Sequence, residues 1–388
     1  MKITDVKPLL AAGVSRIYVF VKVETDQPGL VGWGEASLEG KPRAVAGCLR
    51  DFASMIQGED PLRTEFLWQL MYRSGFWRQG VIGLSALSGI DQALWDIKGK
   101  EFGRPVYELL GGRVRDRVRA YTHFGGDTAE SAAESAVSKK DAGWSAIKTV
   151  PVPITGIVEG IPKVKQAAAS LNEVRQAVGD EVDILLDLHG RLTPQMAVRY
   201  GRAFEEASPF FLEEPCQAEN PKAMAAVREK LDTPIATGER LFTRWGFREI
   251  LDVNAASILQ PDCCHAGGIT ELMKIASMAD VHYAGIAPHN PYGPVSTAAC
   301  VHADFAMPNF VIQEMIDPAD NPDVYELVVD PLPVSDGWIE PPTRPGLGVE
   351  VDEQAVARCA PDFDSGTAGG LTRRVYGAFH SDGGVADS

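Results

Sequence analysis

From about residue 117 onward, short apolar segments alternate with amphipathic ones, and this rhythm restricts the fold more than any other feature. Eight segments have the character of β-strands, in the order VRAYTHF, SAIKTV, DILLDLHG, PFFLEEP, PIATGE, ASILQPD, AGIAPHN and FVIQEM. Helical stretches such as NEVRQAVGD, TPQMAVRYGRAFEEA, PKAMAAVREKL and TRWGFREILDV lie between them. Strands that alternate with helices form a parallel sheet with right-handed crossovers, and eight of them close into a TIM-like barrel. The predicted fold class is therefore α/β.

An open, doubly wound sheet is the alternative architecture for the same alternation. Its nucleotide-binding versions carry a glycine-rich loop, GxGxxG or GxxxxGKS/T, directly after a strand. Neither pattern follows any of the eight segments. The barrel is therefore the preferred prediction.

Residues 1–116 are predicted to form a smaller α+β unit. RIYVFVKVET, a turn at 26–29 and LVGWGEA are typical of a hairpin. Apolar residues recur at helical spacing in AVAGCLRDFASMI, LRTEFLWQLMYR and SALSGIDQALWDIKGKEF. We assign 117–336 to the barrel and 337–388 to a return segment that packs on the N-terminal unit. The Gly- and Ser-rich tail from about residue 365 is given no core role.

The charge balance of the chain restricts its partners. With 37 basic and 53 acidic residues the net charge is -16, which argues against binding nucleic acid or an anionic membrane. The first twenty residues lack a signal-peptide pattern, and no run of 18 apolar residues occurs. A cytoplasmic protein without membrane segments is predicted. The six cysteines form no CxxC pair, so we expect reduced core residues, including Cys263 and Cys264 at a packed strand end.

Acidic residues stand at the ends of three successive predicted strands. Asp187, Glu213 and Glu239 are each separated from the next by 26 residues. Active sites of such barrels lie at the carboxyl ends of the strands, so the three carboxylates should converge on one point. One such acid alone would be interpreted as a solvated or salt-bridged residue. Three buried anions repel one another, and all-oxygen ligation favours Mg²⁺, so the trio predicts one Mg²⁺ per subunit.

Two histidines accompany these acids. His189 lies two residues after Asp187, on the same face if strand alternation continues. His289 ends the seventh strand, and Asp262 at the end of the sixth could hold its imidazole in one tautomer. A lone histidine is more often a packing residue, but two on a proposed metal rim favour proton transfer. An ordinary role is predicted for the other five, of which the first two lie near strand ends: His123, His265, His282, His302 and His380.

Four further strand-end residues are weaker candidates. Glu314 ends strand eight and could bond an oxygen that gains charge, or form a structural salt bridge. Lys148 ends strand two, where we predict an electrostatic contact with the substrate rather than a base. Arg240 and Asn290 adjoin rim positions and are candidates for substrate binding.

In combination these motifs resemble the mandelate racemase and muconate lactonizing branch of the enolase superfamily. The resemblance rests on GIDQALWDIKGK, LLDLHGR, FLEEP, ATGER, LQPDCCHAGGITE, APHNPYGP, VIQEM and RPGLGVEVDE, and it covers nearly the whole chain. It implies an N-terminal α+β capping domain on a modified TIM barrel, (β/α)₇β. It also implies a homo-oligomer that dehydrates a sugar acid, D-galactonate or a close aldonate, through an enolate.

The resemblance also implies roles for individual residues. Asp187, Glu213 and Glu239 match metal ligands, whereas Glu214 in FLEEP does not. His289, oriented by Asp262, matches the base that removes the C2 proton. His189 matches the acid that protonates the departing 3-hydroxyl, and Glu314 matches the group that stabilises the intermediate.

One segment departs from the family pattern. Many relatives carry KxK on strand two, and those that act on galactonate carry Asn at the second position, whereas Thr149 and Val150 follow Lys148 here. The loop 151–166 is also unusual, and the aromatic region 72–78 of the cap is expected to serve mainly in packing. The alternatives are therefore dehydration of gluconate or mannonate, racemisation or cycloisomerisation through the same enolate, and a barrel that binds a sugar acid without catalysis.

Overall fold

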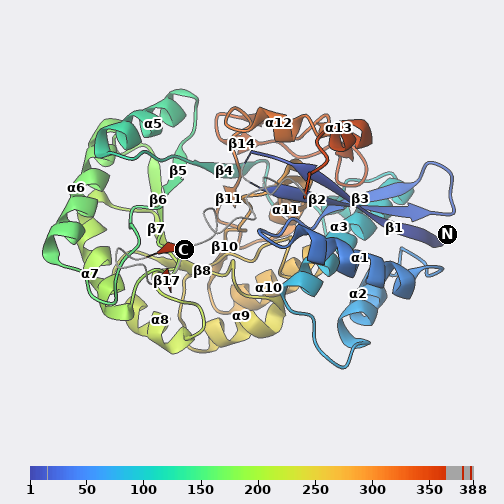
Figure 1. The fold of residues 1–388 in the computed structure, drawn as a ribbon, viewed down its shortest axis with the longest axis horizontal. Coiled ribbons are helices and arrows are strands. Elements are labelled where there is room, and N and C mark those ends of the chain that lie inside the picture. The colour runs from blue at the N-terminus through green and yellow to red at the C-terminus, as the bar shows by residue number, and fades with distance from the viewer. Residues whose placement is uncertain (15, 364–377, 380–384, 387–388) are drawn as a thin grey trace.

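The computed structural model describes residues 1–14, 16–363, 378–379 and 385–386. Figure 1 shows an N-terminal α+β part on one side and a ring of strands and helices on the other. The N-terminal part contains the elements β1 (Ile3–Ala12), β2 (Ile17–Thr25), β3 (Val31–Glu35), α1 (Pro42–Ile56), α2 (Thr64–Arg73), α3 (Val81–Phe102) and α4 (Val106–Leu109). The predicted hairpin and the three predicted helices are confirmed.

The N-terminal sheet is buried on both faces, which explains why its middle strand is apolar at nearly every position. Alternate residues of β2 point to opposite faces. Val19 and Val21 pack in a core with α1 and α3, whereas Tyr18 and Phe20 pack in a core that includes barrel residues. Helix α3 lies so close to β3 that a Cβ on Gly34 would be 1.9 Å from the carbonyl oxygen of Gly89. Glycine at position 34 therefore allows this close packing.

Strand β1 was not predicted from the sequence. It pairs antiparallel with β2 along its whole length and forms one edge of the sheet, in the order β1-β2-β3. Only Ile3, Val6 and Ala11 of this strand are buried, so its apolar residues do not alternate cleanly. Pro8, which is tolerated on an edge strand, further weakens the pattern.

The ring consists of seven strand–helix units and an eighth strand, as (β/α)₇β predicts. Its strands are β4 (Val118–His123), β5 (Ala146–Thr149), β6 (Asp183–Asp187), β7 (Phe211–Glu213), β8 (Ile235–Thr237), β9 (Ile258–Leu259), β10 (Gly285–Ile286) and β11 (Gln313–Glu314). Neighbours from β4 to β10 pair in parallel, and β11 pairs in parallel with β4. Ile286 of β10 forms an isolated parallel bridge with Phe310, which precedes β11. The eight predicted strands are confirmed in order.

Helices cover the outside of this ring, as the left half of Figure 1 shows. They are α5 (Ala129–Asp141), α6 (Ile161–Val178), α7 (Pro194–Phe204), α8 (Pro221–Arg228), α9 (Thr243–Asp252), α10 (Gly268–Val281) and α11 (Pro294–Ala306), with a 3₁₀ turn at Glu205–Ala207. The prediction of a loop over 151–166 is wrong for its last part, because α6 begins at Ile161 with Pro162 in its first turn.

The segment after β11 contacts both parts of the molecule. Its elements are α12 (Pro322–Tyr325), β12 (Val328–Val329), β13 (Val334–Ser335), β14 (Trp338–Ile339), β15 (Glu350–Val351), α13 (Glu353–Arg358), β16 (Ala378–Phe379) and β17 (Val385–Ala386). Strand β14 extends the barrel sheet beside β4, whereas the Cys359 carbonyl accepts a bond from Ala12 N and Glu353 contacts Lys22. The domain boundaries at 116 and 336 stay predictions, and most of the tail after 363 lies outside the described residues. Within the described part of the chain, no helix is long and apolar enough to span a membrane.

Candidate active site

The three strand-end acids meet at the mouth of the barrel. Asp187 is paired in register with Glu213 on the neighbouring strand, so their side chains leave the sheet side by side. Glu239 follows a sharp bend at Gly238, whose φ of 150° and tight contact with Gln260 N exclude a side chain. One carboxylate oxygen from each acid lies within 4.8 Å of the other two. Oxygen ligands on opposite sides of an octahedral Mg²⁺ lie about 4.2 Å apart, so the cluster fits a small divalent cation after slight contraction.

The charges of this cluster are only partly balanced by the protein. Lys148 Nζ lies 3.1 Å from Glu213 and 3.5 Å from Asp187. Burial and the adjacent Asp187 together raise the pKa of Glu213 to about 8, against the opposing effect of Lys148. Burial also acts to raise the pKa of Asp187, but Lys148 and His189 bring it below its usual value. Lys148 alone does not balance the negative charge gathered here, which fits a metal site.

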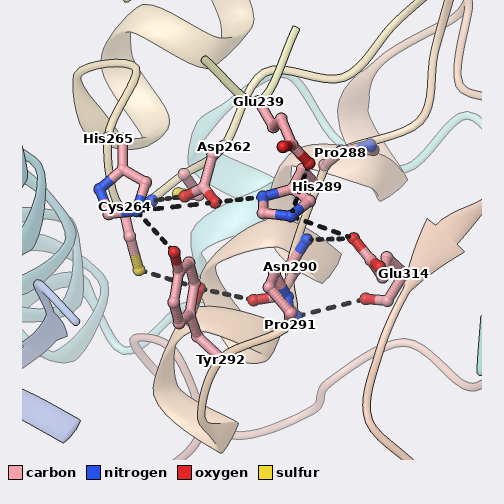
Figure 2. Close-up of polar contacts among 12 residues, drawn as sticks. Glu239, Asp262, Cys264, His265, Pro288, His289, Asn290, Pro291, Tyr292 and Glu314 are labelled. Atoms are coloured by element: carbon pink, nitrogen blue, oxygen red, sulfur yellow. Dashed lines mark hydrogen bonds and ion pairs between the residues drawn. The ribbon is translucent and has the colours of Figure 1, made fainter. Parts of the chain in front are cut away.

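Asp262, which is buried, and His289, which is partly exposed to the cavity, form a dyad beside Glu239, as Figure 2 shows. His289 Nδ1 lies 2.7 Å from Asp262 Oδ2, and the other Asp262 oxygen accepts a bond from Cys264 N. His289 Nε2 lies 3.1 Å from Glu239 Oε2. Burial acts to lower the pKa of His289, but the surrounding carboxylates raise it well above its usual value. In the neutral imidazole this carboxylate holds Nδ1–H, which leaves Nε2 directed at Glu239.

His189 faces the same acids, for a reason that differs from the one predicted. Strand β6 ends at Asp187, and His189 lies in a turn with a φ of 50°, so strand alternation does not orient it. Instead, its backbone N–H donates to Asp187 Oδ1 at 2.9 Å, and its carbonyl accepts from Arg240 Nη2. This turn places His189 Nε2 3.1 Å from Asp187 Oδ2. The local contacts hold the imidazole at the rim of the cluster.

Glu314 is a buried hydrogen-bond acceptor that contacts the same Lys148 ammonium group. Its Oε1 lies 2.6 Å from Lys148 Nζ and 2.6 Å from His123 Nε2, and its Oε2 accepts from Asn290 N at 2.8 Å. Burial acts to raise the pKa of Glu314, but Lys148, His289 and His123 lower it well below its usual value. Glu314 is therefore an ionised carboxylate, and the same salt bridges raise the pKa of Lys148 against its burial.

A cavity of about 540 Å³ covers these groups. Seven of the ten predicted site residues line it: Lys148, Asp187, His189, Glu239, Arg240, His289 and Glu314. Glu213 and Asp262 are fully buried beneath it. Asn290 is also fully buried and is not among the residues that line the cavity, and its side-chain amide bonds to Thr297 and Ser296. Its role in substrate binding stays a prediction.

Four residues of the cap line the cavity: Arg16, Leu38, Glu39 and Val81. Tyr72 packs against Trp68 and Trp245, as expected. The predicted packing role is wrong for Phe76 and Trp77, whose side chains are 90% and 82% exposed.

The sequence interpretation missed two histidines and a tyrosine. His123 and His265, for which an ordinary role was predicted, both line the cavity. His265 bonds Tyr292, as Figure 2 shows, and also Ser85. Tyr292 in turn donates to Glu39 of the cap. Their position near strand ends was the available signal. His282 is exposed, His302 is buried in packing, and His380 lies outside the described residues.

Comparison with known proteins supports the same architecture. Residues 7–111 match the family model of the mandelate racemase / muconate lactonizing enzyme N-terminal domain, and residues 130–355 match that of the enolase C-terminal domain-like family. The chain belongs to the mandelate racemase / muconate lactonizing enzyme family of the enolase superfamily. The resemblance predicted from the motifs is confirmed, together with the capping domain and barrel of the superfamily.

Individual relatives are similar over nearly their whole length. The D-galactonate dehydratase of Ralstonia nicotianae is 43% identical over 89% of this chain and 92% of its own. That of Verminephrobacter eiseniae is 41% identical over 94% and 96%. Among solved structures, a putative dehydratase from Mesorhizobium loti is 35% identical, with a TM-score of 0.88 over 92% of this chain and 98% of its own. A mandelate racemase/muconate lactonizing enzyme from Sulfitobacter is 39% identical, with a TM-score of 0.87 over 92% and 95%.

Proposed function

We propose that this family member is a Mg²⁺-dependent hydro-lyase that converts a sugar acid, D-galactonate or a close aldonate, into a 2-keto-3-deoxy acid. The observation that carries the proposal is the pair of histidines at the acid cluster. His189 Nε2 and His289 Nε2 each lie 3.1 Å from an acid of the cluster, Asp187 and Glu239 respectively. Dehydration needs one group to accept a proton and another to donate one. The relatives named D-galactonate dehydratase supply the substrate class.

The roles of the cluster follow from its charge. Asp187, Glu213 and Glu239 would hold the ion. Bound Mg²⁺ would supply positive charge that offsets the second negative charge arising on the substrate carboxylate when its α-proton leaves. Burial of Glu213 and near-complete burial of Asp187 exclude water from one side of the site, which strengthens the electrostatic interactions within it.

The two histidines divide the proton transfers. His289 donates Nδ1–H to Asp262, and its Nε2 removes the C2 proton, whose bonding electrons give the enolate. His189 then donates a proton to the C3 hydroxyl, which leaves as water while a C2–C3 double bond forms. The resulting enol takes up a proton at C3, loses the proton of its C2 hydroxyl group and becomes the 2-keto-3-deoxy acid. Glu314, as an ionised acceptor, contributes by holding Lys148 beside this charge.

A different aldonate is the second candidate substrate, and Val150 favours it. This side chain is 39% exposed and lines the cavity at the position where a polar group is expected for galactonate. An apolar wall there would select a different arrangement of hydroxyl groups. Gluconate and mannonate are therefore included as alternatives to D-galactonate, with the chemistry unchanged.

A screen of sugar acids with Mg²⁺, read out as 2-keto-3-deoxy product, tests the proposal. We expect at least one aldonate to be dehydrated and to exchange its C2 proton with solvent deuterium. His289→Asn should lower the rate of exchange at least about a hundredfold, because a general base contributes at least that factor to the rate. Exchange with inversion but no keto product would indicate a racemase, and no reaction with any acid would contradict catalysis altogether.

We also propose that the protein is a homo-oligomer, on the basis of the family resemblance stated above. Light scattering of the purified protein measures its mass in solution. A mass equal to that of one chain, 41.9 kDa, would contradict this part of the proposal.

A further inference from the structure

His123 occupies a position on the cavity wall to which the proposed reaction assigns no role. It is the last residue of β4, and 38% of its side chain is exposed. Its Nε2 lies 2.6 Å from Glu314 Oε1. The same Glu314 oxygen lies 2.6 Å from Lys148 Nζ, so the carboxylate joins His123 to the lysine that contacts the acid cluster. The imidazole is thus held in place at one nitrogen.

The contact with Glu314 determines which nitrogen of His123 carries a hydrogen. Glu314 is an ionised carboxylate that accepts from every neighbour, so His123 Nε2 must carry the hydrogen of their contact. A neutral imidazole with Nε2–H presents a lone pair at Nδ1. Within the described residues, no group forms a hydrogen bond with this Nδ1. It is therefore an acceptor available on a wall of the cavity.

Two other histidines are held by contacts with the protein. His302 is fully buried, and its Nδ1 accepts from Tyr107 N. His265 is 4% exposed, and both of its ring nitrogens have protein partners, Ser85 and Tyr292. His123 differs from both in its exposure, and from His265 also in having one nitrogen without a protein partner among the described groups. Its arrangement is that of a ligand-binding side chain.

The surroundings of His123 make this acceptor more valuable. The neighbouring wall of the cavity consists of Phe124, Thr149 and Val150, which are mainly apolar. A polyhydroxy acid carries several hydroxyl groups that lose water on entering the cavity. Each hydroxyl without a partner costs binding free energy. His123 supplies an oriented acceptor on a wall that otherwise has few.

We propose that His123 is a substrate-binding residue whose Nδ1 accepts a hydrogen bond from a sugar-acid hydroxyl other than the departing one, with Glu314 as its positioning residue. The identity of the ligand as a sugar acid rests on the proposed function. The contact would select among aldonates by the position and configuration of that hydroxyl. It therefore adds a polar determinant of specificity beside the apolar Val150.

Two substitutions separate substrate binding from a purely structural tether. In His123→Gln, the amide reaches the place of Nε2 and can still donate to Glu314, but nothing replaces Nδ1. In His123→Asn, the amide oxygen takes the place of Nδ1, but the side chain is too short to reach Glu314. The two variants therefore each retain one half of the histidine. Near-ultraviolet circular dichroism and the thermal midpoint establish that both are folded.

The experiment measures dissociation constants by calorimetry for an aldonate and its monodeoxy analogues. Full-length Mg²⁺-loaded protein is used in a His289→Asn background, so that substrate is not consumed. We expect the parent to prefer the hydroxylated acid over one deoxy analogue by roughly tenfold, the value of one hydrogen bond. His123→Asn should keep most of this preference, and His123→Gln should lose it.

The opposite pattern, with the preference kept in His123→Gln and lost in His123→Asn, would show that His123 only holds Glu314 and would overturn the proposal. A preference that neither variant changes would overturn it as well, and so would a failure of every aldonate to bind. Turnover by the wild-type protein is measured separately. Absence of dehydration together with His123-dependent binding would contradict the proposed function while supporting the role of His123.

Discussion

Lys148 carries most of the charge compensation for the buried acids of the site. Its ammonium lies within 3.5 Å of Asp187, Glu213 and Glu314, and the residue is only 4% exposed. Breaking a buried ion pair by removing one partner leaves an uncompensated charge and costs several kcal/mol. Lys148 should therefore be essential for stability before any role in substrate binding is considered.

We predict that Lys148→Met lowers the free energy of unfolding in metal-free buffer by about 3 kcal/mol. Denaturant unfolding of the wild-type and variant proteins after treatment with a chelator measures this difference. The double variant Lys148→Met/Glu314→Gln serves as the control, because it also removes one of the acids left without a partner. It should recover part of the loss, whereas additive losses would contradict the electrostatic explanation.

At this scale the sequence predicted residues whose positions follow from strand ends alone. Asp187, Glu213 and Glu239 could be identified because equal spacing on successive strands places them on one rim. The role of His123 could not be predicted, because its contact with Glu314 depends on β11 closing against β4, nearly two hundred residues away. His189 was predicted correctly to approach Asp187, but through a turn rather than strand alternation.

Among the secondary-structure elements, helix α11 connects the cap to the catalytic loop. Its first backbone N–H groups, on Gly293 and Ser296, donate to the buried carboxylate of Glu35 from β3. A negative charge at a helix N-terminus satisfies unpaired donors and interacts favourably with the helix dipole. Because His289 lies just before this helix, the cap helps to fix the position of the proposed base.

The missed or misplaced elements share a physical cause. Strand β1 buries only one part of its surface at an edge, so its sequence lacks a clear period of two. The start of α6 follows a stretch rich in Gly and Pro, which favours the prediction of a loop there. Pro162 nevertheless suits the first turn of a helix. The periodicity of apolar residues predicts the elements that have one buried face. The conformation of the other segments depends on their packing in the folded protein.

Helix α11 also contains a buried histidine that should make stability depend on pH. Burial lowers the pKa of His302 to about 4 from an ordinary value of 6.5, against a smaller opposing effect of the Leu347 backbone. Between these values the unfolded chain binds a proton that the folded protein does not. Stability should therefore fall as pH falls from about 6.5 to 4, by up to about 3 kcal/mol from this residue.

His302→Asn is the matched control for this prediction, because its amide oxygen can still accept the bond from Tyr107 N at the place of Nδ1. Urea unfolding of both proteins is compared at pH 7 and near pH 4.5. The loss of stability on acidification should be smaller in the variant. An equal loss in the two proteins would show that other groups cause the acid sensitivity.

At the scale of the whole molecule, the cap, the barrel and the return segment share one apolar core. This core contains Tyr18 and Phe20 from the cap, Val295 from the barrel and Val349 and Val356 from the return segment. The cavity is built in the same way, with Arg16 and Glu39 of the cap opposite the barrel acids. A ligand held by the barrel acids therefore stabilises a structure in which the cap is already docked, and its binding should appear in global unfolding.

We predict that Mg²⁺ raises the thermal midpoint of the chelator-treated protein by a few degrees. An ion that binds only the folded state adds about 2.7 kcal/mol when its concentration is a hundred times its dissociation constant. Glu239→Gln removes one ligand charge and should reduce the shift. Glu353→Gln, at a half-exposed acid paired with Lys22 and distant from the cluster in the fold, should retain it. A cation that neutralises three acids around one point should stabilise the folded protein. Equal thermal midpoints of the wild-type protein with and without Mg²⁺ would therefore contradict a metal site.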